Sequence, residues 1–246
     1  MAEPSPSALA PRDWVAIVVA MALPSAITWV YFFRAETAPA GIQLAVFGAV
    51  KVLQFALPVV WVFAVQRRGG GLPPGPDRLR GLTPAIAFGV LVAAAMFALY
   101  YGLLRSSPLL AEASTEIGAK ISRLRIDRLW KYAALGVFYS LGHSLLEEYY
   151  WRWFVFGQLR RGVALWLAMA VSSLGFMAHH VLVLGKFFGF ENPATWLFSA
   201  CVAIGGTVWA WLYERSGSLV GPWLSHLLID AAIFAIGYDL VRHLLV

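Results

Sequence analysis

The amino-acid sequence predicts an all-α fold, a polytopic transmembrane helix bundle of about seven to eight spans that forms one membrane domain over residues 1–246. Hydrophobic residues make up 60% of the chain and charged residues 13%, whereas soluble domains are ~45–50% apolar and ~25% charged. The mean hydropathy is +0.71, and the apolar residues gather in runs of about 20, the length that crosses the hydrocarbon core of a bilayer. The 11 Trp and 9 Tyr supply rings for both membrane interfaces. We therefore expect an integral, multi-pass membrane protein.

Seven apolar runs mark the expected spans, in order 14–33, 41–65, 82–104, 129–158, 163–184, 194–213 and 218–238. The first run follows a polar leader over residues 1–13, expected to be cytoplasmic. It is too long for the core of a signal peptide and lacks a convincing cleavage site, so we expect a retained helix. Between the second and third runs, Gly and Pro keep the loop 66–81 irregular.

Basic residues predict the orientation of the spans. The loop 66–81 contains four arginines, which place it in the cytoplasm by the positive-inside rule: Arg67, Arg68, Arg78 and Arg80. Counting spans from this loop puts the Arg160–Arg161 turn and Arg215 on the same side. The basic segment 105–128 then falls on the opposite side. Its apolar residues recur at helical spacing, so it is either an amphipathic helix lying on the membrane or the sign of a miscounted span.

The charge balance and the cysteine count exclude several classes of partner. The chain has 19 Lys and Arg against 13 Asp and Glu, but no basic stripe with interleaved aromatic residues lies outside the apolar runs. We therefore expect no nucleic-acid partner. The one cysteine, Cys201, excludes an internal disulfide and a Cys-based zinc cluster. The Ala-, Arg- and Trp-rich composition favours a bacterial cytoplasmic membrane.

The stretch "LLEEYYWRWF" places Glu147, Glu148 and Arg152 inside the fourth apolar run. A charge at the centre of a bilayer costs ~2.5–3.5 kcal/mol even on a lenient insertion scale, so these side chains need partners. Glu148 and Arg152 are four residues apart in the favourable order and are expected to form an ion pair. Glu147 lies ~100° round the helix without that partner. An unpaired buried carboxylate is a candidate functional group.

Two later runs also contain ionisable side chains. "GFMAHHVL" contains His179 and His180, which lie ~100° apart on a helix, so we expect one of them to face a site. "SHLLID" contains His226 and Asp230, which are four apart and share a face. Phe176, one turn before His180, is expected to pack.

Two further residues each allow two interpretations. His143, one turn before Glu147, either hydrogen-bonds that carboxylate or packs. Lys51, alone in the second run with Gln54 nearby, either snorkels to the interface or lines a cavity.

The ionisable residues are expected to meet at a similar depth. At a rise of ~1.5 Å per residue, Glu147 lies roughly 20 Å back from the Arg160–Arg161 turn, and His180 roughly 28 Å along the next helix. From the turn near Arg215, His226 is roughly 16 Å and Asp230 roughly 22 Å into the membrane. Because both turns are assigned to the same side, the four side chains are expected to converge inside the bundle.

These residues resemble the three motifs of the CPBP family of intramembrane endopeptidases, also called the CAAX protease and bacteriocin-processing, or Abi, family. The matching motifs, in order, are Glu147-Glu148-x-x-x-Arg152, Phe176-x-x-x-His180 and His226-x-x-x-Asp230. They lie within an expected catalytic core over residues 129–240. The third motif is often written with Asn at its last position, whereas this chain has Asp230.

The resemblance implies a helix bundle that cuts a peptide bond near the membrane surface. By matching position, Glu147 would act as the general base and activate a water molecule together with His180. His226 and residue 230 would help to bind the oxyanion, and Glu148 with Arg152 would orient the site. An ionised Asp230 would repel an oxyanion, so it is expected either to orient His226 or to ligate a metal.

No cofactor is expected, and a metal-free mechanism is favoured because "HSLLE" does not reproduce the HExxH spacing of zinc proteases. The alternative is zinc or another divalent metal, with four candidate ligands: Glu147, His180, His226 and Asp230. The expected partners are the lipid bilayer and a membrane-associated protein or peptide substrate. The sequence predicts no oligomeric state.

Several substrates and two other functions stay open. Prenylated CAAX proteins, bacteriocin precursors and proteins with a membrane-embedded carboxyl-terminal sorting tag are all compatible with the family. An ion- or proton-coupled transporter would also contain buried Glu, His and Asp, although inverted repeats are absent. The third possibility is a non-catalytic immunity or partner-binding protein.

Overall fold

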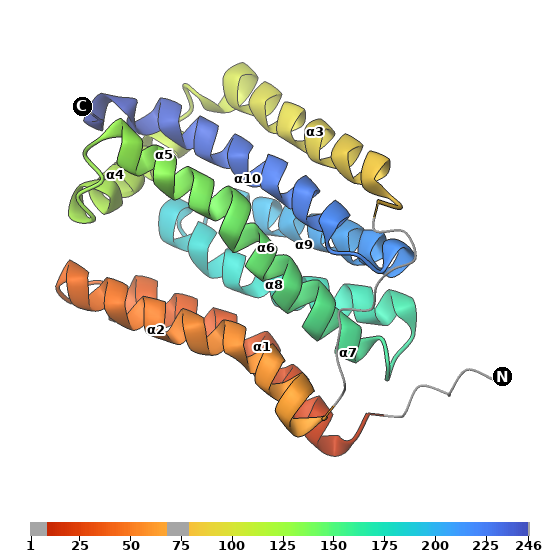
Figure 1. Cartoon of the computed structure of the whole chain (residues 1–246). Coiled ribbons are helices and arrows are strands. Elements are labelled where there is room, and N and C mark those ends of the chain that lie inside the picture. The colour runs from red at the N-terminus through yellow and green to blue at the C-terminus, as the bar shows by residue number, and fades with distance from the viewer. Residues whose placement is uncertain (1–8, 68–78, 246) are drawn as a thin grey trace.

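The computed structural model describes residues 9–67 and 79–245, and Figure 1 shows them as a bundle of helices. Within those ranges every regular element is helical, which confirms the predicted all-α class. The first eight residues of the predicted leader, and Arg68 and Arg78 of the predicted cytoplasmic loop, lie outside the described residues.

Most of the predicted spans correspond to long helices. In order, these are α1 (Pro11–Trp29) with the π-helical η1 (Val30–Arg34), α2 (Ala40–Val59) with η2 (Val60–Val65), α3 (Leu82–Leu99) with η3 (Tyr100–Leu104), α8 (Leu165–Phe188), α9 (Pro193–Ser216), and α10 (Val220–Val241) with the short η6 (Arg242–Leu244). Each of these six is long and apolar enough to cross a membrane. The chain is an integral, multi-pass membrane protein.

The fourth apolar run forms one continuous helical path with changing pitch. Its consecutive parts are α5 (Leu129–Val137), η4 (Phe138–His143), α6 (Ser144–Glu148), η5 (Tyr149–Phe156) and α7 (Gly157–Leu159), of which η4 and η5 are π-helical. We call this path the α5–α7 helix. π-Helical turns are rare and are found often at functional sites. Here they flank the short α6, which contains both glutamates.

Residues 105–128, where the topology prediction was ambiguous, contain the helix α4 (Pro108–Arg123). Its apolar side is buried through Leu110, Ala113 and Ile121. α4 packs against α8 and α10, so part of its amphipathic pattern is explained by packing within the chain. It is not among the helices of the described region that are long and apolar enough to span.

The three motif-carrying segments are neighbours in space. α10 packs against α3 on one side and against α9 and the α5–α7 helix on others, while α8 packs between α1 and α9. η5 contacts both α8 and α9, and α6 contacts α10. The glutamates, the histidine pair and the His226–Asp230 pair are therefore drawn from helices that share one core.

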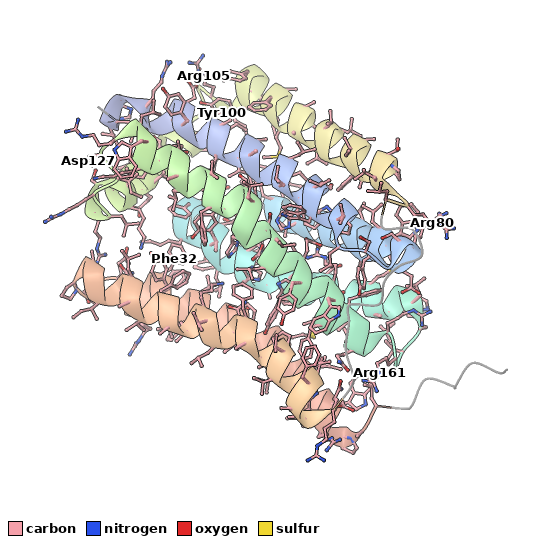
Figure 2. All side chains as sticks on the ribbon, in the orientation of Figure 1. Phe32, Arg80, Tyr100, Arg105, Asp127 and Arg161 are labelled. Atoms are coloured by element: carbon pink, nitrogen blue, oxygen red, sulfur yellow. The ribbon has the colours of Figure 1, made fainter. Side chains whose placement is uncertain are left out.

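The basic residues fall at the two ends of the bundle in the way that the span count predicts. Figure 2 shows Arg80 and Arg161 at the end where α7 lies, and Arg105 and Asp127 at the opposite end, near α4. That Arg80 and Arg161 share an end agrees with counting spans from the loop 66–81. That this end faces the cytoplasm stays a prediction.

Hydrogen bonds between polar side chains connect the amino-terminal helices to the α5–α7 helix near α7. The carboxylate of Asp13, which is 5% exposed, accepts hydrogen bonds from Trp61 Nε1 at 3.2 Å and Gln66 Nε2 at 2.8 Å. Gln66 Nε2 also lies 3.0 Å from Gln158 Oε1 on α7. Since buried polar atoms are costly when unpaired, these bonds hold α1 and η2 in register with the helix that carries the glutamates.

Candidate active site

Glu147 lies in the bundle interior, surrounded by three imidazoles. Its side chain is 7% exposed, and its Oε1 lies 3.4 Å from His179 Nε2 on α8. Its Oε2 lies 3.8 Å from His226 Nε2 on α10 and 3.8 Å from His143 Nδ1 one turn earlier in its own helix. Of the two possibilities left open for His143, hydrogen-bonding to Glu147 or packing, the 3.8 Å distance is too long for a hydrogen bond. The carboxylate that Arg152 does not neutralise has imidazole neighbours from three helical segments.

Glu148 joins the α5–α7 helix to α10 through one buried carboxylate. It is 0% exposed, and its Oε1 lies 3.2 Å from Arg152 Nη1 and 2.8 Å from His226 Nδ1. Because an ionised carboxylate only accepts, Nδ1 is the donor in the His226 bond. This bond turns His226 Nε2 toward Glu147 and toward Asp230, whose Oδ1 is 3.6 Å away. The predicted Glu148–Arg152 ion pair is present in the structure, with the imidazole as a third member.

The Arg152 guanidinium is enclosed by aromatic rings as well as by Glu148. Its Cζ lies 4.6 Å from the ring centroid of Phe176 and 4.9 Å from that of Trp209, which are cation–π distances. Gly206 on α9 leaves room for it, since a Cβ there would lie 3.3 Å from Arg152 Nη2. Phe176 is 1% exposed and packs, as the sequence analysis expected.

Two tryptophans that the sequence analysis did not identify orient the histidines. Trp209 on α9 stacks on His226 with ring centroids 4.2 Å apart and an interplanar angle of 15°. Trp151 lies nearly parallel to His179 at 5.8 Å. Neither tryptophan stands out among the 11 in the chain, and α9 carries no ionisable motif. Only the packing of α9 against α8, η5 and α10 reveals the role of Trp209.

His180 sits beside this cluster and has a defined tautomer. Its Nδ1 lies 2.9 Å from the carbonyl oxygen of Phe176, which can only accept, so Nδ1 donates and the Nε2 lone pair is free. Its ring is 4.2 Å from that of His179. Within residues 9–67 and 79–245, no ion pair of 4.0 Å or less joins His180 to Glu147, whereas His179 makes one. The preference for His180 over His179 as the functional histidine stays a prediction.

The four candidate metal ligands come from three helices: Glu147 from α6, His180 from α8, and His226 and Asp230 from α10. In the part of the chain that the structure describes, no group of three or more His, Cys, Asp or Glu side chains is arranged to hold a metal ion. His180 donates its Nδ1–H to a backbone carbonyl, which leaves Nε2 as its free ring nitrogen. The metal-free mechanism and the alternative with a divalent metal both stay predictions.

Replacing Glu148 by Gln should destabilise the protein strongly. The change removes the charge that compensates the enclosed Arg152 guanidinium, and breaking a buried ion pair costs ~3–5 kcal/mol. Glu147→Gln is the matched control, because it removes a neighbouring carboxylate that no arginine neutralises. Thermal unfolding in detergent should give a much lower Tm for Glu148→Gln than for Glu147→Gln. Equal Tm values would show that the ion pair is not a structural element.

One known protein family matches part of this chain. The family model described as type II CAAX prenyl endopeptidase Rce1-like matches residues 128–232. The matched segment contains all three motifs, from Glu147 to Asp230. Comparisons with curated proteins and with solved structures give no match. The resemblance to the CAAX protease, or CPBP, family is therefore confirmed, and it lies in residues 128–232, the segment similar to the Rce1-like type II CAAX prenyl endopeptidases.

Proposed function

We propose that this protein is an intramembrane endopeptidase that hydrolyses a peptide bond of a membrane-associated protein or peptide with a water molecule activated by Glu147. The observation that carries the proposal is the buried Glu147 carboxylate in contact with His143, His179 and His226. Peptide hydrolysis needs a base for the attacking water and donors near the developing negative charge. The match to Rce1-like endopeptidases over the same residues supports this reaction class.

In the proposed mechanism, Glu147 accepts a proton from water while the water oxygen attacks the scissile carbonyl carbon. His180, with its Nε2 lone pair free, positions that water. The resulting oxyanion lies on the side of His226, which is oriented by Glu148 and Asp230. The C–N bond then breaks, and Glu147 returns the proton to the leaving amine. Glu148 and Arg152 hold the two helices at this spacing and do not touch the substrate.

Glu147→Gln should abolish cleavage and leave the protein folded. Loss of a general base lowers the rate by ~10²–10⁴-fold, and the amide keeps the shape of the side chain. Mass spectrometry of membrane proteins from cells with and without the protein should detect new carboxyl termini that disappear with Glu147→Gln. Cleavage at the wild-type rate in this variant would show that another group is the base. The absence of any new terminus with the wild type would favour the non-catalytic, partner-binding function.

The two adjacent histidines should respond differently to alanine. His180→Ala should remove most of the activity, because the proposed mechanism uses its free Nε2 on the water. His179→Ala should reduce activity less, because His179 contacts Glu147 but has no assigned contact with the substrate. Both variants should be assayed on the same cleaved membrane protein. Activity that survives His180→Ala and is lost in His179→Ala would reverse the assignment.

A membrane-permeant chelator should leave the activity unchanged. The proposed base acts directly on water, so the reaction requires no divalent ion. The assay compares cleavage before chelation, after chelation, and after adding back zinc or another divalent metal. Activity that disappears with the chelator and returns only with metal would establish a metal-dependent mechanism and overturn this part of the proposal.

A further inference from the structure

Lys51 is a membrane-embedded cation that the proposed mechanism has not used. It lies in α2, is partly buried, and places its Nζ 5.5 Å from the ring centroid of Phe47 and 5.6 Å from that of Phe55. No carboxylate of the described residues lies within 4.0 Å of this ammonium. A cation inside a membrane span is costly, and such residues commonly have a functional counter-charge. The charge of Glu147 acts on this ammonium from beyond ion-pair distance.

Phe55, one of the two aromatic neighbours of Lys51, also contacts the candidate active site. The Phe55 ring lies 6.3 Å from the His143 ring, and His143 lies 3.8 Å from Glu147. Lys51 also interacts electrostatically with Glu147, His143 and His179. These contacts connect Lys51 to the candidate site, while the two interpretations left open from the sequence, snorkelling to the interface and lining a cavity, both stay predictions.

The charged side chains around Glu147 determine the electrostatic surroundings of a negative charge that forms on the substrate. Three carboxylates lie close together, Glu147, Glu148 and Asp230, joined through His226. The guanidinium of Arg152 is 2% exposed and is already paired with Glu148 behind aromatic rings. A negative charge that develops on a substrate oxygen beside Glu147 would have His226 on one side, with the three carboxylates close by. Electrostatic stabilisation of such charge is a large part of catalysis in acyl transfer.

We propose that the Lys51 ammonium stabilises the oxyanion of the tetrahedral intermediate and so acts as a catalytic residue contributed by α2, outside the segment that matches the family. This inference rests on the proposed function. Water attack converts the carbonyl into an oxyanion while Glu147 takes the water proton, and Lys51 neutralises the new charge without transferring a proton. When the C–N bond breaks, the carbonyl reforms and the counter-charge is no longer needed.

Lys51→Met should lower kcat by ~10²–10³-fold and change KM little, because one transition-state donor of this kind contributes that factor. The assay uses a synthetic peptide that spans the Glu147-dependent cleavage site found by mass spectrometry, prepared with a free and with an amidated carboxyl terminus. Lys120→Met is the matched control. Lys120 also stands over two aromatic rings, at 4.1 Å from Tyr31 and 5.2 Å from Phe32, but belongs to α4, and it should retain wild-type kcat.

Chemical rescue separates the charge from the shape of the side chain. In a Cys201→Ala background, Lys51→Cys should be inactive, and alkylation with 2-bromoethylamine should restore much of the activity by rebuilding an ammonium at nearly the same distance from the backbone.

A wild-type kcat in Lys51→Met would overturn the inference about Lys51, whereas Glu147-dependent cleavage in the same assay would still support the proposed function. A loss confined to KM, and to the peptide with a free terminus, would also overturn it and assign Lys51 to the substrate carboxylate. If the wild type cleaves nothing, the proposed function fails and the inference fails with it.

Discussion

The candidate site depends on one carboxylate that is buried where charge is least tolerated. Glu148 is fully enclosed and binds Arg152 of its own helix and His226 of α10. A lone ion in this environment would cost a large part of the free energy of unfolding of a typical domain, ~5–15 kcal/mol. The three groups therefore stabilise one relative position of the α5–α7 helix and α10. That position in turn sets His226 Nε2 3.8 Å from Glu147.

The need to pair buried charges gives the two adjacent glutamates different surroundings. Glu148 has a guanidinium partner and an imidazole partner, which agrees with its proposed structural role. Glu147, one residue earlier, has imidazoles but no arginine within ion-pair distance among the described residues. An imidazole can orient a carboxylate without neutralising it permanently, and this difference is the reason that Glu147 is the proposed general base.

Much of this arrangement could be predicted from the sequence because a charged side chain inside a membrane span needs a partner in the bundle interior. Runs of apolar residues predicted the helices, and the spacing of Glu148 and Arg152 predicted their ion pair, which the structure contains. Helix depth predicted that Glu147, His180, His226 and Asp230 converge. The structure brings Glu147 and Asp230 to His226, whereas His180 lies beside His179 without an ion pair to Glu147 among the described residues. The contacts of Trp209 and Lys51 could not be predicted. Both depend on how α9 and α2 pack, and neither residue belongs to a motif or a charge pair in its own helix. The adjacency of His179 to Glu147 depends on the rotation of α8, which helical spacing does not determine.

The most direct test of this account is a double-mutant cycle on Glu148 and Arg152, measured as the free energy of unfolding in detergent. The single variants Glu148→Gln and Arg152→Gln each leave one buried charge without its partner. The double variant removes both charges and should be markedly more stable than the sum of the single losses predicts, with a coupling energy of ~1–3 kcal/mol. Strictly additive losses would contradict the claim that this buried ion pair sets the geometry around Glu147.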